Sequence, residues 1–595
     1  MKGSRKPVAT KFDRKCGRRA VIAAWFTCLA AILTQGAAAA RPARIPVILI
    51  SVDTLRADHL SAYGYRKIAT PNIDAFLRNG TQFRNVSCQI PLTLPSHTSL
   101  FTSTYPSENG IEENAQHVPA GMTTLASALR GQGYKTAAFI GSVFLEKQMG
   151  LDQGFDVYDS PFDFEAFSPI SGEVFFGRSS QPQYAGREGR DGALVVAAAR
   201  QWLTRRRNEP TFVFLHLFDM HQPYSQPASI ARERGISRYD AQLLYVDRLL
   251  GAFRQSLVAD GVWDKSLVVL VADHGEGLGD HGEANHGYFI YQSTLWVPLL
   301  VHWPSSAGPY RPIVSDPAGL IDVAPTILDF LHISAPHTFH GRSLLGEASG
   351  ATPSRPEEVY SESLHAHHSF GWASLRSLRI SSYKYIQAPH PELYNLQNDP
   401  REQNNIFGKD PRRDSLLQAE LAKFLSRYPS PGSAQPASIS PRTDALLRSL
   451  GYLSDGPQLP LERSEADPKE RLAEFKQYNV ASEAASDGHR DRAISILSEL
   501  VARDPNNLLA LRDIGAYSLD RKSYAKARSS FQRFLARAPN DYMGRFELGV
   551  ADERLGRFKE AENELQRACS IAPEATKCTH ELALVRQRIR ETGNR

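Results

Sequence analysis

The chain has 595 residues, of which 42% are hydrophobic and 22% are charged. This length allows two or three domains, and the composition is that of ordinary globular proteins, which excludes a chain that is disordered overall. The formal charge of +5 comes largely from residues 1–40, which hold eight Lys or Arg and one Asp, so the rest of the chain carries −2. We therefore expect no nucleic-acid partner.

Residues 1–40 have the parts of an export signal. A basic stretch over 2–19 is followed by an apolar run of 14 residues over 20–33 and by small residues at 37–40 that suit cleavage. Fourteen residues are short for a membrane-spanning helix, which needs about 20. We expect a signal peptide and an exported protein, periplasmic or extracellular, with membrane association only if an uncleaved leader acts as an anchor.

An apolar run of strand length over residues 45–52 ends at Asp53. Continuous hydrophobicity predicts a strand that is buried on both faces, as in a parallel sheet covered by helices. Asp53 would then lie at the carboxyl end of the strand, where open α/β sheets collect ligand sites.

Residues 91–106 read PLTLPSHTSLFTSTYP and place Thr93 ahead of a run that mixes hydroxyl and apolar side chains. This pattern predicts the first turns of a buried helix, whose free backbone N–H groups favour an anion near Thr93. Because Thr-x-Pro-Ser is also ordinary turn and N-cap chemistry, a nucleophilic Thr93 depends on support from other segments.

Strand and helix patterns alternate through the next part of the chain. A capped helix from residue 70 ends near Gly80 and precedes a strand, and residues 123–142 repeat this plan. A helix over 193–206 leads into a buried strand over 211–218. The alternation predicts an α/β fold with a mostly parallel sheet and helices on both faces.

Residues 266–282 read SLVVLVADHGEGLGDHG and repeat the plan of the first strand. A buried strand is followed by Asp273, His274 and a glycine-rich loop. A carboxylate is a hard metal ligand and an imidazole a borderline one, so the pair suits a divalent ion. Asp-His-Gly alone is more often a turn, but with Asp53 and Thr93 at comparable positions the sequence predicts a metal site.

Several segments, in this order, resemble the sulfatase branch of the alkaline phosphatase superfamily. They are VDTLRAD at 52–58, TLPSH at 93–97, HQPY at 221–224, ADHGEGLGDHG at 272–282 and PELYNLQNDPREQNNI at 391–406. The resemblance covers roughly residues 46–427. It implies the family's mostly parallel sheet, a divalent metal beside a nucleophile and a small C-terminal sheet, for which residues 374–394 have alternating strand character.

The sequence departs from the family pattern at four positions. Sulfatases convert a Cys or Ser to formylglycine where Thr93 stands, and they carry Arg at His97. Threonine is not a known substrate of that conversion, so we expect no formylglycine and a nucleophile that is the Thr93 hydroxyl itself. His274 stands where Asn is usual, and Thr54 replaces a second Asp. Imidazole favours manganese or zinc, with calcium as the alternative.

The resemblance also implies roles for the candidate residues. Asp53, Thr93, Asp273 and His274 would hold the metal, and Thr93 would attack the ester. His97 would help the metal to neutralise charge on the non-bridging oxygens.

Two further histidines are candidate catalytic residues. His221 in HQPY matches the family's substrate-facing His and suggests a general acid, and His286 falls near a Lys that binds sulfate in sulfatases. A second ion held by Asp219, His221 and His286 remains an alternative, although the Asp-x-His spacing does not match the two-zinc members.

Another histidine cluster, formed by His365, His367 and His368, is expected in a loop near the pocket mouth, with metal binding as the alternative. Cys88 is expected to be a small buried hydrophobe. Cys569 and Cys578 are close enough in sequence to bridge two helices in an oxidising compartment.

The end of the chain has a different organisation. Residues 428–468 are rich in Pro, Ser and Gly and predict a linker, with a short helix over 444–453. Beyond it, three sets of similar residues recur with a spacing of 34 residues. They are Ala493, Ala527 and Ala561; Leu497, Phe531 and Leu565; and Pro505, Pro539 and Pro573. This pattern resembles tetratricopeptide repeats, which form an all-α solenoid and present a groove to a protein or peptide partner.

These observations predict a signal peptide at 1–40, a sulfatase-like catalytic domain at 44–427, a linker at 428–468 and about three repeats at 469–595. The first functional hypothesis is a metal-dependent hydrolase or transferase that acts through Thr93 on a phosphodiester of a small molecule, glycan or lipid. The second is a sulfatase for a sulfated saccharide or an aryl sulfate. The third is an inactive binding protein that works through its repeats.

Overall fold

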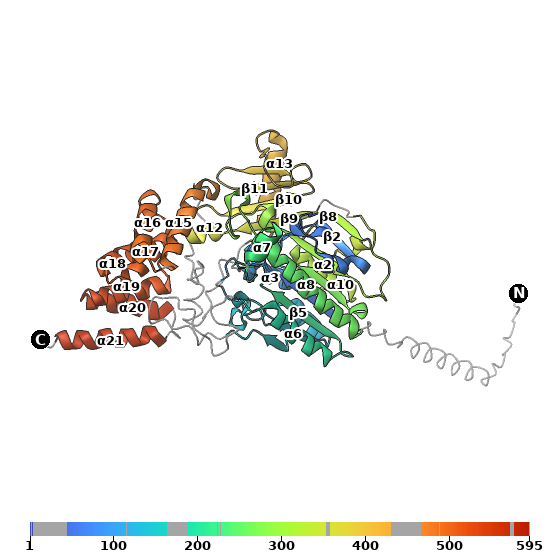
Figure 1. Ribbon diagram of the computed structural model, residues 1–595, viewed down its shortest axis with the longest axis horizontal. Coiled ribbons are helices and arrows are strands. Elements are labelled where there is room, and N and C mark those ends of the chain that lie inside the picture. Colours follow the sequence, from blue (N-terminus) through green and yellow to red (C-terminus); the bar gives the residue numbers. More distant parts are fainter. Residues whose placement is uncertain are drawn as a thin grey trace. The chain divides into compact units, whose positions relative to one another are not determined.

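The computed structural model describes residues 1, 3, 45–114, 116–162, 189–222, 224–226, 228–352, 357–429, 466–486, 488–571 and 576–593. The chain divides into two units, Met1–Arg44 and Ile45–Arg595, and the second contains every helix and strand described below (Figure 1). Nearly all of the predicted leader, and the predicted linker helix over 444–453, lie outside the described residues. No described helix is long and apolar enough to cross a membrane.

The centre of the second unit is a sheet of eight strands in the order β4-β3-β5-β1-β6-β7-β2-β8. β7 is antiparallel to β6 and β2, and the other neighbours are parallel. The predicted mostly parallel sheet is therefore confirmed. The strands are β1 (Val47–Val52), β2 (Gly80–Ser87), β3 (Lys135–Phe139), β4 (Val157–Asp159), β5 (Thr211–Leu217), β6 (Leu267–Val271), β7 (Trp296–His302) and β8 (Ile313–Gly319).

Helices cover both faces of this sheet. On one face, the Phe101 ring of α3 contacts Phe214 of β5, with centroids 4.8 Å apart. The next residue of β5, Leu215, points to the other face and pairs with Phe139 of β3. Trp202 of α6 contacts Phe139, so α6 covers that other face. The helices of this part are α2 (Pro71–Asp74), α3 (Thr93–Thr102), α4 (Pro106–Asn109), α5 (Leu125–Gly131), α6 (Gly192–Thr204), α7 (Ala228–Arg234), α8 (Arg238–Ala259), α9 (Gln292–Leu295), α10 (Val323–Phe330), α11 (Leu345–Ala348), α12 (His365–Phe370) and α13 (Pro411–Arg427).

The predicted small C-terminal sheet is also present. It has four antiparallel strands in the order β12-β11-β10-β9. Helix α13 packs on it through Phe424, whose ring stacks on Tyr360 at a centroid distance of 4.6 Å. The strands are β9 (Glu358–Ser363), β10 (Leu375–Ile380), β11 (Tyr383–Gln387) and β12 (Glu392–Asn395).

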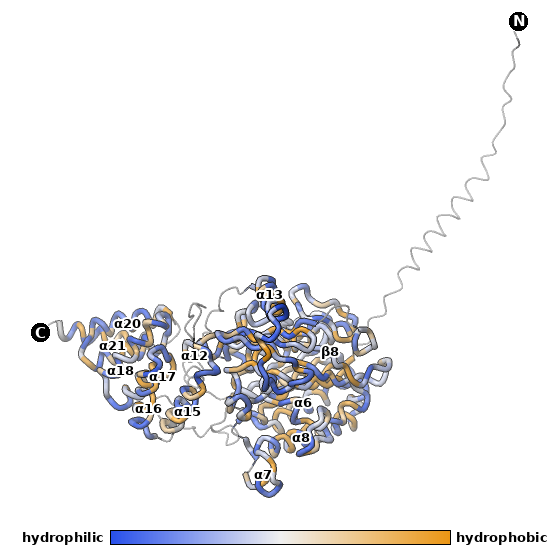
Figure 2. Tube along the Cα trace, turned by 90° about the horizontal axis from the view of Figure 1, so that it is seen from above, coloured by the Kyte–Doolittle hydropathy of each residue, from blue (hydrophilic) through white to orange (hydrophobic). Residues whose placement is uncertain are grey.

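The 34-residue period corresponds to pairs of helices that pack on one another. A Cβ atom at Gly515 would lie 2.6 Å from the Phe531 ring, and one at Gly549 would lie 2.7 Å from Leu565, so each glycine allows its helix pair to approach closely. Orange and blue stretches mix along these helices in Figure 2, as expected of amphipathic helices. They are α15 (Leu472–Ser486), α16 (Arg490–Arg503), α17 (Leu508–Asp520), α18 (Tyr524–Leu535), α19 (Tyr542–Arg554), α20 (Phe558–Ile571) and α21 (Thr576–Gly593).

The cysteines take the predicted states. A disulfide joins Cys569 of α20 to Cys578 of α21, and Cys88 is a buried free thiol.

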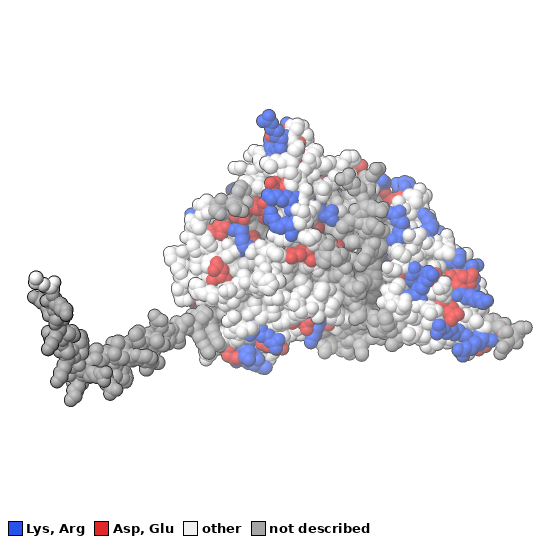
Figure 3. Space-filling view, turned by 180° about the vertical axis from the view of Figure 1, so that it is seen from behind, with Lys and Arg blue, Asp and Glu red and all other residues white. Residues whose placement is uncertain are grey.

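Charged side chains of the repeats form ion pairs in several places, for example between Arg545 and Glu564. Figure 3 shows Lys and Arg interspersed with Asp and Glu on the face it draws, so charge on that face does not indicate a partner of one sign.

Candidate active site

Three separate segments meet at the carboxyl edge of the central sheet. Asp53 directly follows β1, and Asp273 follows β6 after one intervening residue. Because β1 and β6 are parallel neighbours, the two carboxylates lie at the same edge. Thr93 is the first residue of α3, so its hydroxyl lies where the backbone N–H groups of the first turn are free.

The side chains converge as the sequence predicts for a metal site. A carboxylate oxygen of Asp53, one of Asp273 and a ring nitrogen of His274 all lie within 4.8 Å of one another. The Thr93 hydroxyl donates a hydrogen bond to Asp53 Oδ2 at 3.3 Å. All four residues are 0% exposed.

Three of these ligand atoms lack hydrogen bonds within the described part of the chain. Among the described residues, Asp53 Oδ1, Asp273 Oδ2 and His274 Nε2 have no hydrogen-bond partner. Burial raises the pKa of both carboxyl groups. Burial alone would lower the pKa of His274, but the neighbouring carboxylates Asp273 and Asp53 outweigh that effect and raise it. Buried polar atoms without partners cost free energy, and a divalent cation would satisfy all three. Two carboxylates and an imidazole therefore fit such an ion.

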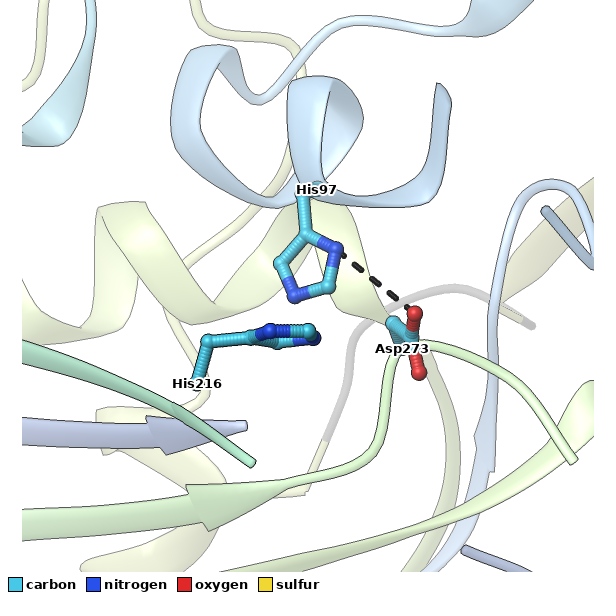
Figure 4. Close-up of side chains that lie close together, drawn as sticks. All are labelled: His97, His216 and Asp273. Atoms are coloured by element: carbon cyan, nitrogen blue, oxygen red, sulfur yellow. Dashed lines mark ion pairs between the residues drawn. The ribbon is translucent and has the colours of Figure 1, made fainter. Parts of the chain in front are cut away.

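The hydrogen bonds of His97 do not favour the role predicted for it. Its Nδ1 lies 2.7 Å from the Thr93 carbonyl oxygen and must donate to it, which leaves Nε2 to accept from the Ser51 hydroxyl at 2.9 Å. Burial lowers the pKa of His97 to about 3, so the ring is neutral and cannot neutralise charge on the ester. Figure 4 shows it directed toward Asp273, 3.6 Å away, and we infer that it fixes the first turn of α3.

Sequence analysis missed His216, which lies beneath the site on β5. Its Nε2 is 3.5 Å from Asp53 Oδ2, and its ring centroid is 4.9 Å from that of His97 (Figure 4). Burial lowers the pKa of His216 to about 4, so this imidazole is neutral. His97, His216 and Asp273 form a second group with metal-ligand spacing, but both His97 nitrogens are already hydrogen-bonded. A single His within an apolar strand was the only signal in the sequence.

Asn114 was also missed. It is 0% exposed, and its Oδ1 accepts the Leu94 N–H at 2.8 Å, directly after Thr93. Its Nδ2 has no hydrogen-bond partner among the described residues. A buried amide donor held beside a nucleophile suits a non-bridging ester oxygen. No pattern in the sequence distinguishes this asparagine from others in loops.

His221 and His286 lie on one side of the ligand group. The His286 ring centroid is 4.3 Å from that of His274 and 5.3 Å from that of His221. His286 Nδ1 is 3.1 Å from Glu276 Oε1. Burial lowers the pKa of His286 and raises that of Glu276 to about 7, so the pair can hold one proton between them near neutral pH. Sequence analysis did not identify Glu276 as a candidate.

The position of Asp219 does not favour the alternative of a second ion. Asp219 Oδ1 accepts the Gly192 N–H at 3.2 Å, at the start of α6. A Cβ atom at Gly192 would lie 2.3 Å from Asp219 Oδ2, so this carboxylate faces α6 and not His221 or His286. The groups of metal-ligand spacing among the described residues do not include it.

The histidine cluster is a helix and not the predicted loop, because residues 365–370 form α12. Its members have separate partners, which argues against the alternative of a shared metal. The contacts are His365 Nδ1 to Glu113 Oε2 at 2.9 Å, His367 Nδ1 to the Trp372 carbonyl at 2.8 Å and His368 Nε2 to Glu112 Oε2 at 3.6 Å.

Comparison with known proteins agrees with this geometry. Residues 46–333 match the Sulfatase family, and residues 279–429 match the family described as N-sulphoglucosamine sulphohydrolase, C-terminal. Residues 478–542 and 519–576 match the tetratricopeptide repeat. The predicted resemblance is therefore confirmed in both parts of the chain.

Individual relatives match over the catalytic part. An arylsulfatase of Clostridium perfringens is 22% identical, over 64% of this chain and 94% of its own length. An N-acetylglucosamine-6-O-sulfatase of Bacteroides thetaiotaomicron is 23% identical, over 64% of this chain and 85% of its own.

Solved structures show the same fold. The structure of Ps i-CgsB in complex with k-i-k-neocarrahexaose aligns with a TM-score of 0.55 at 20% identity, and covers 66% of this chain and 95% of that one. The chain thus consists of a sulfatase-family hydrolase domain, with the fold of the alkaline phosphatase superfamily, followed by C-terminal tetratricopeptide repeats.

Proposed function

We propose that the catalytic domain hydrolyses sulfate esters, with sulfated saccharides as the favoured substrates. The observation that carries this proposal is the match of the catalytic part to two sulfatase families and to an N-acetylglucosamine-6-O-sulfatase. The Thr93 hydroxyl, 3.3 Å from Asp53 Oδ2 within a buried group of metal-ligand atoms, supports ester cleavage at this site. This was the second hypothesis from the sequence, and the comparisons support it better than the first.

The residues suggest a two-step displacement. Thr93 Oγ1 attacks the sulfur and passes its hydrogen toward Asp53 Oδ2, while the bond between sulfur and the leaving oxygen breaks. His286, paired with Glu276, or His221 beside it supplies the proton that the leaving oxygen needs. Water then gives a proton to the group that supplied one to the leaving oxygen and attacks sulfur. Thr93 Oγ1 leaves with the proton that Asp53 returns, so sulfate is released and the site is regenerated.

Other groups would stabilise charge in this reaction. Asn114 Nδ2 would donate to a non-bridging oxygen. A divalent cation held by Asp53, Asp273 and His274, with manganese or zinc favoured, would lower the pKa of the Thr93 hydroxyl and attract the ester oxygens.

Phosphodiester hydrolysis or phospho-group transfer is a second candidate, which the identity of Thr93 favours. An unmodified hydroxyl beside a metal group can form a covalent phospho-enzyme directly, and no formylglycine is expected at a threonine. The third hypothesis, an inactive binding protein, has less support, because Asp53, Asp273 and His274 keep metal-ligand spacing and the Thr93 hydroxyl lies beside them.

Export to the periplasm or cell exterior remains a proposal that rests on the composition of residues 1–40. A protein or peptide partner on the repeats rests on the repeat match alone.

A substrate panel tests the proposed function. The purified chain, loaded with manganese or with zinc, is assayed on an aryl sulfate, a 6-O-sulfated saccharide and an aryl phosphodiester. We expect a kcat/KM for at least one sulfate ester about tenfold or more above that for the phosphodiester. A faster phosphodiester reaction would replace the first candidate by the second, and no turnover of any ester by metal-loaded protein would exclude both.

Thr93→Val removes the hydroxyl but keeps the β-branched shape. We expect kcat/KM to fall by about 10³-fold or more, because the nucleophile is lost, and Thr93→Ser to stay within about tenfold of wild type. Thr98→Val is the matched control, since it removes a buried hydroxyl of the same helix that donates to the Leu94 carbonyl at 2.8 Å. A Thr93→Val protein with the wild-type rate would contradict the assignment.

Asn114→Asp tests whether the side-chain amide of Asn114 donates to the ester. Aspartate keeps an oxygen that can accept the Leu94 N–H but cannot donate to the ester, so kcat/KM should fall by about 10²-fold to 10³-fold. The midpoint of thermal unfolding checks that the variant is folded. An unchanged kcat/KM in folded protein would show that Asn114 does not contact the reacting group.

A further inference from the structure

The first repeat helix contacts the loop that carries His286. We call residues 277–288 the catalytic loop. At its middle, a Cβ atom on Gly282 would lie 2.8 Å from Leu472 Cδ1 of α15. At its end, the Tyr288 ring packs on Phe475 of the same helix with centroids 4.4 Å apart. Two residues one turn apart on α15 therefore support two points of the loop.

Helix α12 strengthens this contact from the catalytic side. Phe370 and Trp372 are at most 2% exposed and belong to the same apolar cluster as Phe475 and Tyr478. The Phe370 and Tyr478 rings have centroids 5.6 Å apart. Trp372 Nε1 donates to Asp504 Oδ2 at 3.0 Å, in the turn after α16. The catalytic domain and the first repeat, which we define as α15 and α16, thus share one hydrophobic core.

Polar contacts fix the start of the repeat array at the same place. The Ala373 N–H donates to the Ala466 carbonyl at 2.9 Å. Asp467, which is 1% exposed, accepts the His390 N–H at 3.0 Å. Lys469 Nζ lies 2.6 Å from Glu392 Oε1. Buried hydrogen bonds of this kind make a defined orientation and not a loose tether.

The catalytic loop can transmit the position of α15 to His286. Glu283 accepts the N–H groups of Tyr288 and Phe289 at 2.9 and 3.3 Å, which closes the loop on itself. His286 lies only two residues before Tyr288, and its Nδ1 is held by Glu276. At the other end, Arg56 Nη1 donates to the Glu276 carbonyl at 3.1 Å. The loop is therefore anchored by Arg56 on one side and by the first repeat on the other.

We propose that the first repeat is a working part of the active site, in which Leu472 and Phe475 are positioning residues that hold the catalytic loop and hence His286. The inference rests on the proposed function only where it assigns His286 a part in ester cleavage. This side of the first repeat is filled by the chain's own α12 and Tyr288, so a partner of the array has the later repeats available. A partner that shifts α15 would change turnover without touching the ester.

Phe475→Ala in the full chain tests the proposal, with Phe546→Ala in α19 as the matched control. Phe475 and Phe546 are 6% and 4% exposed, and the cluster around Phe546 contains repeat residues only. The first readout is kcat and KM on the ester that the wild-type protein turns over fastest. The second is the rate of hydrogen exchange of the Tyr288 and Phe289 backbone amides. We expect Phe475→Ala to lower kcat at least tenfold with KM within threefold, and to speed exchange of both amides. Phe475→Leu should restore part of each, and Phe546→Ala should change neither.

Unchanged kcat and exchange in folded Phe475→Ala would overturn the proposal, as would an equal effect of Phe546→Ala. If Phe475→Ala does not fold, Leu472→Ala, which removes the contact with Gly282, is judged by the same two readouts. If the wild-type protein turns over no ester, the proposed function fails and hydrogen exchange alone decides whether the repeat holds the loop.

Discussion

The structure depends on two carboxylates buried at the ends of neighbouring parallel strands. Asp53 and Asp273 are fully buried, and each has an oxygen without a hydrogen-bond partner among the described residues. Burying two carboxylates side by side disfavours the folded state, and a divalent cation is a natural counter-charge for two carboxylates and an imidazole. The parallel register of β1 and β6 brings these groups together, and the start of α3 adds Thr93 beside them.

The sequence predicted the parts of the site that follow strand ends. Asp53 and Asp273 each follow a largely apolar run of strand length, and topology places such residues at one edge. Asn114 and His216 could not be predicted, because a loop amide and a single histidine within an apolar strand gain their roles only from tertiary contacts. For the same reason the sequence could not show that the His97 ring donates to the Thr93 carbonyl in the first turn of α3 and that this imidazole is neutral.

The repeats were predictable as helices but not as part of the enzyme. The 34-residue period follows from contacts that recur in each repeat, such as Gly515 against Phe531. The contact between Phe475 and Tyr288 occurs only in the first repeat among the described residues, so the 34-residue period could not predict it. It joins a module usually associated with partner binding to the loop that carries His286, and it suggests that substrate turnover and occupancy of the array are linked.

A divalent cation between Asp53, Asp273 and His274 and against the Thr93 hydroxyl would explain why these groups are buried together. Anomalous diffraction from crystals of the full chain grown with manganese locates such an ion without reference to activity. We expect one strong peak among these three side chains, next to Thr93 Oγ1. The absence of a peak there, or a peak elsewhere with Thr93 remote from it, would show that these residues do not form a metal site.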